Sequence, residues 1–183
     1  MNTANNKKGI LYKEKLKKGL LGLMEKGVEI DRISVKAICE AADVNRSTFY
    51  SHYAVPRDIL LEIEEETLAS ISGYMRKMVS LDFDYLTAFL EYIKGHDDVF
   101  RILFLYAKDK PFLERLTQEA LFHFDDVKVW FKNKNDYTYV KTFITSGSRD
   151  VINAWIQRDY AEDVEYIKRL ILTVNEAAIK AFT

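Results

Sequence analysis

A dense row of hydrogen-bond donors stands between residues 45 and 52 of the sequence, and no acidic residue interrupts it. The row consists of Asn45, Arg46, Ser47, Thr48, Tyr50, Ser51 and His52. Guanidinium, hydroxyl, amide and imidazole groups can bind phosphate oxygens and the edges of bases. The row therefore predicts contact with a nucleic acid. A short exposed helix of this composition is typical of the second helix of a helix-turn-helix, which enters the major groove of DNA.

Two helices are expected to position this row. Ser34 is a suitable N-cap for the first, because its hydroxyl can accept a hydrogen bond from a backbone N–H at the helix start. The apolar residues that follow repeat at helical spacing and form one face: Val35, Ile38, Cys39 and Ala42. Asp43 then stands where the chain must turn, and Asp tolerates the left-handed conformation better than most residues. Val44 is expected to be buried between the two helices.

Asn45 is expected to cap the second helix, and Phe49 and Tyr53, four residues apart, can face the same core. With these features in place, residues 33–61 resemble the DNA-binding domain of the tetracycline-repressor (TetR) family of bacterial transcriptional regulators. The resemblance extends back over the first helix and is most specific over residues 35–53, where core, cap and contact positions agree together. The resemblance implies an all-α fold in which the polar side of the second helix binds double-stranded DNA.

The resemblance assigns the DNA contacts residue by residue. Thr48, Tyr50 and His52 match family positions that touch phosphates or base edges. Arg46 can reach a guanine, whose two acceptors suit a guanidinium. The full set that we expect to bind DNA is Lys36, Asn45, Arg46, Ser47, Thr48, Tyr50, Ser51, His52 and Arg57, with Lys36 and Arg57 at phosphates. Each residue alone could be an ordinary solvated side chain, but this alternative is weak for the set.

Two positions depart from the family pattern. Asp43 stands where the family commonly has Gly, and Pro56 stands where it often has Lys. The second departure removes one expected phosphate contact, which the neighbouring Arg57 can replace. Pro56 also suits the first turn of a following helix, because the N–H that it lacks would have no helical partner there.

Composition favours an all-α protein. The 183 residues are 48% hydrophobic, which is ample for a core, and two prolines with seven glycines are too few for a chain of tight β-turns. A single cysteine excludes an internal disulfide. The sequence has no long apolar run and no signal-peptide pattern. Together with the single cysteine, these features predict a cytoplasmic protein that does not bind membranes.

Charge is distributed unevenly along the chain. Residues 1–58 hold eleven Lys or Arg and seven Asp or Glu, a net charge of +4. Residues 59–183 hold sixteen and twenty-one, a net charge of −5. The basic end therefore carries the expected DNA surface, as phosphate binding requires, although an imbalance this small can also arise by chance.

Residues for catalysis or metal binding do not gather in the sequence. The three histidines are scattered, Cys39 lies on the apolar face of a predicted helix, and no Gly-rich phosphate loop occurs. The acidic run 62–66 has no histidine at ligand spacing and is expected to be a solvated helix face. We therefore expect no enzymatic activity, no metal and no cofactor.

The expected architecture is a helix-turn-helix head over residues 1–55 and a helical effector-binding and dimerisation domain over residues 56–183, with about nine helices in all. Helical periodicity predicts helices over 9–26, 56–79 and 112–132, and a run of polar residues predicts a loop over 132–136.

The last two helices carry the strongest periodicity, with apolar residues three and four apart throughout. Either they pack in a monomeric core, or each subunit contributes both to a four-helix bundle at a two-fold axis. The resemblance favours a homodimer with interface residues Ile152, Trp155, Ile156, Ile167, Ile171 and Val174. The segment 147–156 also looks like the corresponding helix of TetR proteins from low-GC Gram-positive bacteria. A dimer presents two recognition helices to a palindromic operator.

Aromatic residues of the body lie in the helices that enclose the effector pocket in TetR-like proteins. They are Tyr92, Phe100, Phe104, Phe122, Trp130 and Tyr137, with His123 as a candidate polar anchor. The alternative is that these side chains simply fill the core. The resemblance implies a dimeric repressor that a small hydrophobic effector releases from its operator. The alternative is a regulator or coactivator of the same fold that a protein partner controls.

Overall fold

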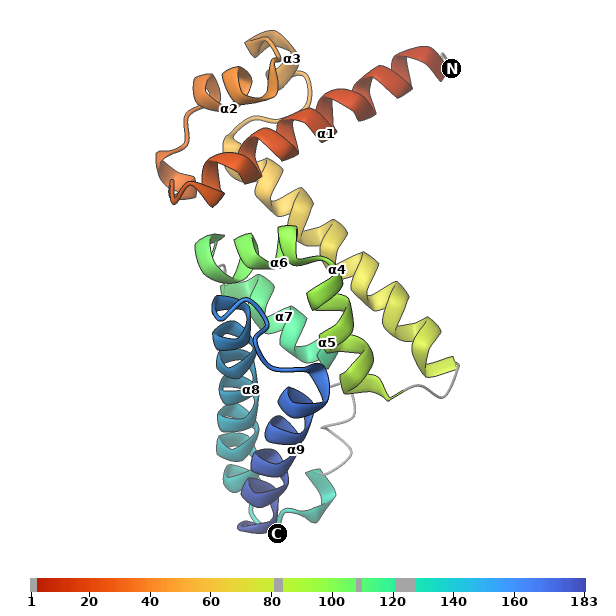
Figure 1. Cartoon of the computed structure of the whole chain (residues 1–183), viewed down its shortest axis with the longest axis vertical. Coiled ribbons are helices and arrows are strands. Elements are labelled where there is room, and N and C mark those ends of the chain that lie inside the picture. The colour runs from red at the N-terminus through yellow and green to blue at the C-terminus, as the bar shows by residue number, and fades with distance from the viewer. Residues whose placement is uncertain (1–2, 81–83, 108–109, 121–127) are drawn as a thin grey trace. The chain divides into compact units, whose positions relative to one another are not determined.

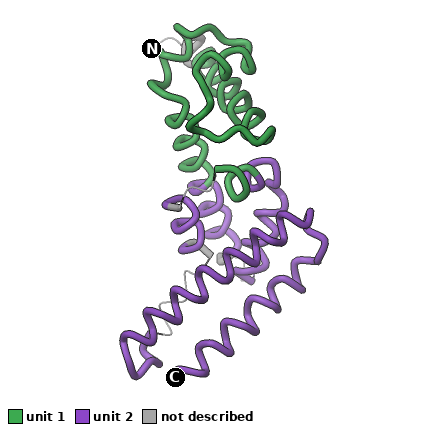
Figure 2. The backbone as a smooth tube through the Cα atoms, turned by 90° about the vertical axis from the view of Figure 1, so that its left-hand side faces the viewer, with its two compact units in different colours: residues 1–67, 102–108 green, residues 68–101, 109–183 purple. Residues whose placement is uncertain are grey.

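The computed structural model describes residues 3–80, 84–107, 110–120 and 128–183, and every regular element within these ranges is a helix. The chain therefore has the all-α fold that its composition predicts (Figure 1). Packing divides the chain into two compact units, residues 1–67 with 102–108 and residues 68–101 with 109–183 (Figure 2). The first unit holds the predicted helix-turn-helix head, together with the first part of the following long helix.

The first unit is built around a long N-terminal helix. Its elements are α1 (Thr3–Glu25), the 3-10 turn η1 (Ile30–Arg32), α2 (Val35–Ala42), α3 (Arg46–Tyr50), the first part of α4 (Pro56–Ser80) and the π-helical segment η2 (Leu103–Ala107). α1 packs along α2 and also contacts η2. The centre of this unit consists of fully buried apolar side chains, among them Leu16, Leu20, Ile38, Phe49 and Ile59. α4 begins at Pro56, which confirms the expected helix start.

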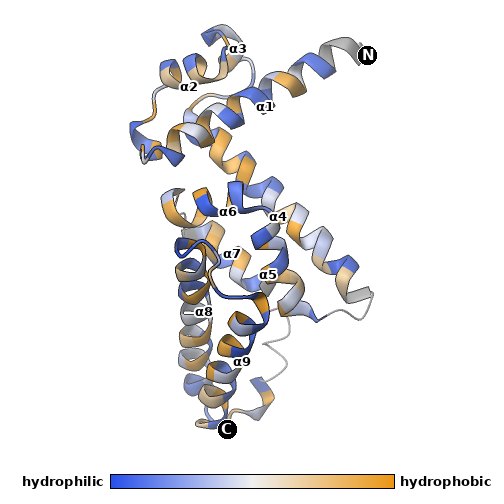
Figure 3. Ribbon diagram, in the orientation of Figure 1, coloured by the Kyte–Doolittle hydropathy of each residue, from blue (hydrophilic) through white to orange (hydrophobic). Residues whose placement is uncertain are grey.

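The second unit is a bundle of helices. After the rest of α4 it contains α5 (Tyr85–Gly95), α6 (Asp97–Ile102), α7 (Lys110–Ala120), α8 (Lys134–Gln157) and α9 (Val164–Lys180). α9 packs against α8 and α5, and α7 packs against the same two helices. Apolar and polar bands alternate along α8 and α9 (Figure 3), as expected for helices that bury one face. Phe89 and Trp155 lie at the centre of this core.

Three boundaries differ from the sequence-based prediction. α1 begins at Thr3, six residues before the start expected at residue 9. The described part of α7 is Lys110–Ala120, and residues 128–130 form a 3-10 turn, so the helix predicted over 112–132 does not reach residue 132. The loop predicted over 132–136 is shorter than expected, because α8 begins at Lys134. Asn133 caps that helix: its Oδ1 accepts a hydrogen bond from the N–H of Asn135 at 2.9 Å.

Candidate nucleic-acid interface

The turn between α2 and α3 has the backbone conformation that the sequence predicts. Asp43 is left-handed, with φ 51° and ψ 55°. The N–H of Val44 donates to the carbonyl of Cys39 at 3.0 Å and closes the end of α2. At the other end of α2, the Ser34 hydroxyl accepts a hydrogen bond from the N–H of Ala37 at 3.1 Å. The predicted cap and the predicted turn of α2 are confirmed, whereas Val44, which was expected to be buried, is half-buried.

α3 is held together by hydrogen bonds at both of its ends. The Asn45 carboxamide oxygen accepts from the N–H of Thr48 and from the hydroxyl of Ser47, both at 2.8 Å. The Ser51 hydroxyl donates to the carbonyl of Thr48 at 2.7 Å. Asn45 is therefore the helix cap that the sequence predicts, and its side chain stabilises a helix of only five residues. Ser47 and Ser51 can still accept hydrogen bonds from a ligand.

The two faces of α3 differ completely in exposure. Phe49 is fully buried, and Tyr53, just beyond the helix, is buried beside it. On the other face Tyr50 is 60% exposed, and Arg46 is exposed as well. The remaining residues of the predicted DNA-contact set around this helix are exposed (Asn45, Ser47, Ser51) or half-buried (Thr48, His52). The helix thus presents donors and acceptors outward while one aromatic side chain anchors it in the core.

Two further predicted contact residues already have acidic neighbours. Lys36, on the exposed side of α2, lies 3.7 Å from Glu40, and both side chains are well exposed. Arg57, in the first turn of α4, donates to Asp31 of η1 at 2.9 Å. Pairs this exposed contribute little to stability. A phosphate could therefore compete for either cation at small cost.

The acidic run on α4 differs from its predicted role as a solvated face. Lys17 of α1 is almost completely buried, and its ammonium lies 2.6 Å from Glu66 and 3.0 Å from Glu62. Lys13 pairs with Glu62 at 2.8 Å, and Glu64 is buried. Burial alone would lower the pKa of Lys17, but its hydrogen bonds to Glu66 and Glu62 outweigh burial and raise that pKa. The run therefore ties α1 to α4, and only part of it is solvated.

The described residues hold no group of three or more His, Cys, Asp or Glu side chains that could bind a metal ion. Cys39 is buried, and burial raises the pKa of its thiol, which disfavours the reactive thiolate. None of the described helices combines the length and the apolar content needed to cross a membrane.

The predicted effector residues lie in different environments. Tyr92 and Phe100 are buried and pack edge to face at 6.0 Å. Phe104 is buried in η2 of the first unit, whereas Trp130 is 58% exposed. Phe122 and His123 lie outside the described residues. A cavity of about 350 Å³ lies instead between α7 and α8, and most of the residues along it are of polar types, with Tyr137 the one predicted aromatic residue among them.

Most residues predicted at the dimer interface belong to the core of a single chain. Ile152, Trp155, Ile156, Ile167 and Ile171 are all buried, so packing within the chain accounts for their periodicity. Of the six predicted residues, Val174 alone is exposed, at 46%. The predicted interface set leaves out the other apolar side chains that α8 and α9 expose: Tyr139, Phe143, Tyr166, Leu170 and Leu172. A second apolar row on each helix was the signal that could have indicated them.

An all-α chain with a capped helix-turn-helix and an exposed polar second helix has the features of the helix-turn-helix transcriptional regulators. Its sequence matches the family model TetR_C_8, "Transcriptional regulator C-terminal region", over residues 83–176, a little over half of the chain. The chain belongs to the TetR family of transcriptional regulators. No curated protein sequence matches it.

Solved structures share the fold. The TetR transcriptional regulator from Streptococcus agalactiae 2603V is similar with a TM-score of 0.71 and 22% identity, over 94% of this chain and 97% of that one. The fatty acid degradation regulator FadR from Bacillus halodurans has a TM-score of 0.60 and 13% identity, over 92% and 94%. The dihydroxyacetone kinase operon activator DhaS has a TM-score of 0.54 and 19% identity, over 94% and 98%. At these identities the similarity supports the fold alone.

Proposed function

We propose that this transcriptional regulator is a homodimeric, sequence-specific DNA-binding repressor that a small hydrophobic effector releases from its operator. One observation carries the DNA-binding part: α3 buries Phe49 and exposes Arg46 and Tyr50. No acidic residue occurs in the sequence between Asp43 and Asp58. A surface of donors without carboxylates suits the phosphates and base edges of a major groove.

The contact residues divide into those that read bases and those that bind phosphates. Arg46 is the proposed reader of guanine, because an exposed guanidinium can donate to both acceptors of that base. Tyr50, Thr48 and His52 contact base edges or phosphates, and Ser47 and Ser51 offer acceptors. Asn45 acts first by holding α3 in shape. Lys36 and Arg57 bind phosphates and position the head.

A dimer supplies the second recognition helix. We propose that the interface uses the exposed apolar side chains of α8 and α9, including Phe143, Leu170 and Val174, in place of the buried ones. Replacing Phe143 and Leu170 with Asp is expected to yield a monomer in analytical ultracentrifugation. Val129→Asp is the matched control, since Val129 is 83% exposed but lies outside both helices. A wild-type protein that stays monomeric at high concentration would contradict this interface.

The effector is proposed to bind in the second unit near Tyr92 and Phe100. Polar anchors are available there: the Ser70 and Tyr92 hydroxyls are 2.6 Å apart, and the His96 ring stacks on Tyr92 at 4.0 Å. Phe122, His123 and Trp130 remain candidates for the same site, whereas Phe104 belongs to the first unit and is left out of it. The effector acts if it binds more tightly to a conformation whose two heads are wrongly spaced for DNA.

The DNA-binding proposal is tested by selecting sequences from a random duplex pool with the wild-type protein. A palindromic motif is expected. Gel-shift titrations then compare Arg46→Ala and Tyr50→Ala with Arg32→Ala, whose side chain is 79% exposed on η1 outside the helix-turn-helix. The first two are expected to bind the selected site more weakly, by about 1–3 kcal/mol for a lost base contact. Equal affinity of all three variants would contradict the assignment.

A second candidate function is control by a protein partner, with activation of transcription in place of repression. One structural neighbour, DhaS, is named an operon activator, so the fold is compatible with that mode. A thermal-shift screen against small hydrophobic compounds separates the two, because a ligand of the native state raises its stability. A hit that also weakens DNA binding favours the effector. Recovery of one stoichiometric protein partner favours the alternative.

A further inference from the structure

We infer that the N-terminal turns of α1 form a second DNA contact, in which Lys8 binds a backbone phosphate beside the groove that α3 enters. This inference rests on the proposed DNA-binding function. It adds to the helix-turn-helix a residue that precedes the most specific part of the family resemblance, residues 35–53.

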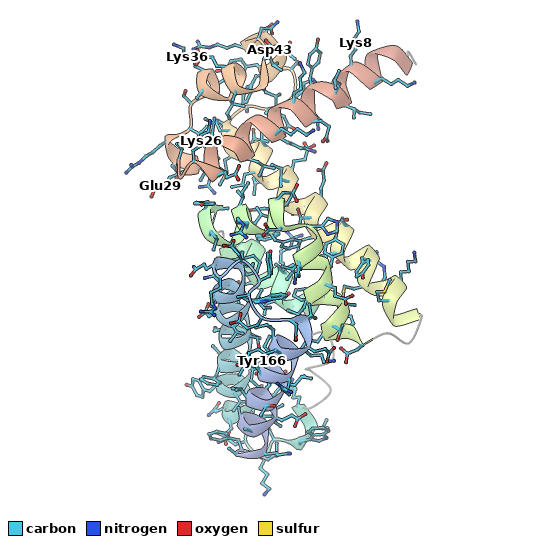
Figure 4. The ribbon with its side chains drawn as sticks, in the orientation of Figure 1. Lys8, Lys26, Glu29, Lys36, Asp43 and Tyr166 are labelled. Atoms are coloured by element: carbon cyan, nitrogen blue, oxygen red, sulfur yellow. The ribbon has the colours of Figure 1, made fainter. Side chains whose placement is uncertain are left out.

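The N-terminal part of α1 lies beside the end of α3. A β-carbon at Gly9 would lie 3.6 Å from Cε1 of His52, so the backbone next to Lys8 runs beside the end of α3. Lys36, Asp43 and Lys8 all lie along the upper edge of the first unit in Figure 4, whereas Lys26 and Glu29 lie lower, at the C-terminal end of α1. Any duplex that α3 contacts therefore passes close to Lys8.

The lysines of α1 differ in whether a carboxylate lies near their ammonium group. Lys13, Lys15 and Lys17 of α1 lie 2.8 Å from Glu62, 3.9 Å from Asp43 and 2.6 Å from Glu66, respectively. The first acidic residue of the sequence is Glu14, so every charged side chain among residues 1–13 is a lysine. Lys8 is exposed, and within the described ranges no carboxylate lies within ion-pair distance of it. Its charge is therefore available to a polyanion.

A lysine lies near each end of α3. Lys36 lines a shallow hollow together with Arg46, at the first turn of α3, while Lys8 stands near His52, just past its last turn. A major groove is about 12 Å wide and is bounded by one phosphate backbone on each side. A helix in that groove with a lysine near each end can engage both backbones. An ammonium on a flexible stem suits a single phosphate better than the paired acceptors of a base.

The experiment measures how affinity depends on salt. Lys8→Ala, Lys8→Arg and Lys26→Ala are compared with wild type on the selected DNA by fluorescence anisotropy, from about 50 to about 200 mM salt. Lys26 is the matched control, because it is an exposed lysine just past the other end of α1. A lost phosphate contact lowers the slope of log affinity against log salt by about 0.9 for each subunit bound. This drop is expected for Lys8→Ala alone, with an unchanged selected sequence and an unchanged thermal midpoint.

The possible results distinguish a failure of the Lys8 contact from a failure of the proposed DNA binding. If wild type binds a selected site and Lys8→Ala keeps the slope of Lys26→Ala, the Lys8 contact is wrong and the helix-turn-helix assignment stands. If Lys8→Ala changes the selected sequence while the slope stays constant, Lys8 reads bases and the phosphate role is overturned. If wild type selects no DNA, both proposals fail together.

Discussion

The contact between α1 and α2 depends on a glycine, and a pair of alanine substitutions can measure how much. A β-carbon at Gly19 would lie 3.2 Å from Cβ of Ala42 and 3.3 Å from two backbone atoms of α2, the Ala42 nitrogen and the Ile38 oxygen. A β-carbon at Gly22, in the next turn of α1, would have no atom within 4 Å. The two positions therefore differ mainly in how closely α2 approaches.

The expected magnitudes follow from two opposing effects. Glycine inside a helix costs about 0.5–1 kcal/mol relative to alanine, so Gly22→Ala should stabilise the protein by that amount. Gly19→Ala gains the same helix propensity but forces backbone atoms of α2 to move, and overpacking typically costs about 1–3 kcal/mol. We therefore expect Gly19→Ala to be less stable than Gly22→Ala by about 1–3 kcal/mol. Because α2 carries α3, DNA affinity should fall for Gly19→Ala alone.

The measurement is urea unfolding followed by circular dichroism, at one protein concentration because a dimer's stability depends on it. Gly19→Val extends the series, since its larger side chain cannot fit without separating the helices. Equal stabilisation by Gly19→Ala and Gly22→Ala would refute the reasoning, because it would mean that α2 does not approach α1 as closely as the structure has it.

Two further changes test the second unit. Asp84 caps α5, and the N–H of Thr87 chiefly holds the pKa of its carboxyl below the ordinary value, with help from Lys168 at 3.6 Å. Asp84→Asn keeps a cap but loses the charge, so at neutral pH the variant should unfold at a lower urea concentration than wild type. The two urea midpoints should converge as the pH falls through the lowered pKa of Asp84. A difference between the midpoints that does not change with pH would contradict this explanation. Tyr160 donates to Asp97 at 2.6 Å. Tyr160→Phe should cost about 1.5 kcal/mol in urea unfolding, whereas Tyr106→Phe, at an exposed site of η2 outside the proposed dimer interface, should leave stability unchanged. Equal stability of the two phenylalanine variants would contradict the Tyr160 contact.

Local features of the helix-turn-helix could be predicted from the sequence because their causes lie within a few residues. The cap at Ser34 needs only the N–H of Ala37, and the cap at Asn45 needs only that of Thr48. The left-handed turn at Asp43 follows from the residue type and from its place between two helices. Each of these predictions is confirmed without reference to the rest of the fold.

Interactions between distant segments could not be predicted in the same way. Lys17 and Glu66 are 49 residues apart, and no periodicity in either helix indicates that one buries its charge against the other. On α8 and α9, two apolar rows compete for the core. The rows that contain Trp155 on α8 and Ile167 on α9 are buried, whereas the row that contains Phe143 on α8 is exposed. Which row is buried depends on α5 and α7, which pack on these helices.

Asp43 is one of the two positions where the sequence departs from the family pattern, and two substitutions can separate its backbone role from its charge. The left-handed conformation costs an ordinary residue about 1–2 kcal/mol and costs glycine almost nothing. The Asp43 side chain is fully exposed, and its pair with Lys15 at 3.9 Å contributes little. Asp43→Gly should therefore stabilise the protein by about 1 kcal/mol, whereas Asp43→Asn, which tolerates the same conformation, should leave stability unchanged.

DNA affinity should respond differently, because Asp43 carries its negative charge beside Lys36 and Arg46 on the proposed DNA surface. Both substitutions remove that charge and should tighten binding to the selected site by a similar factor, most strongly at low salt. If Asp43→Asn binds DNA no better than wild type, the α2–α3 turn does not face the duplex. If Asp43→Gly gains affinity but no stability, the turn carries no strain and charge alone distinguishes this protein from the glycine-bearing members of its family.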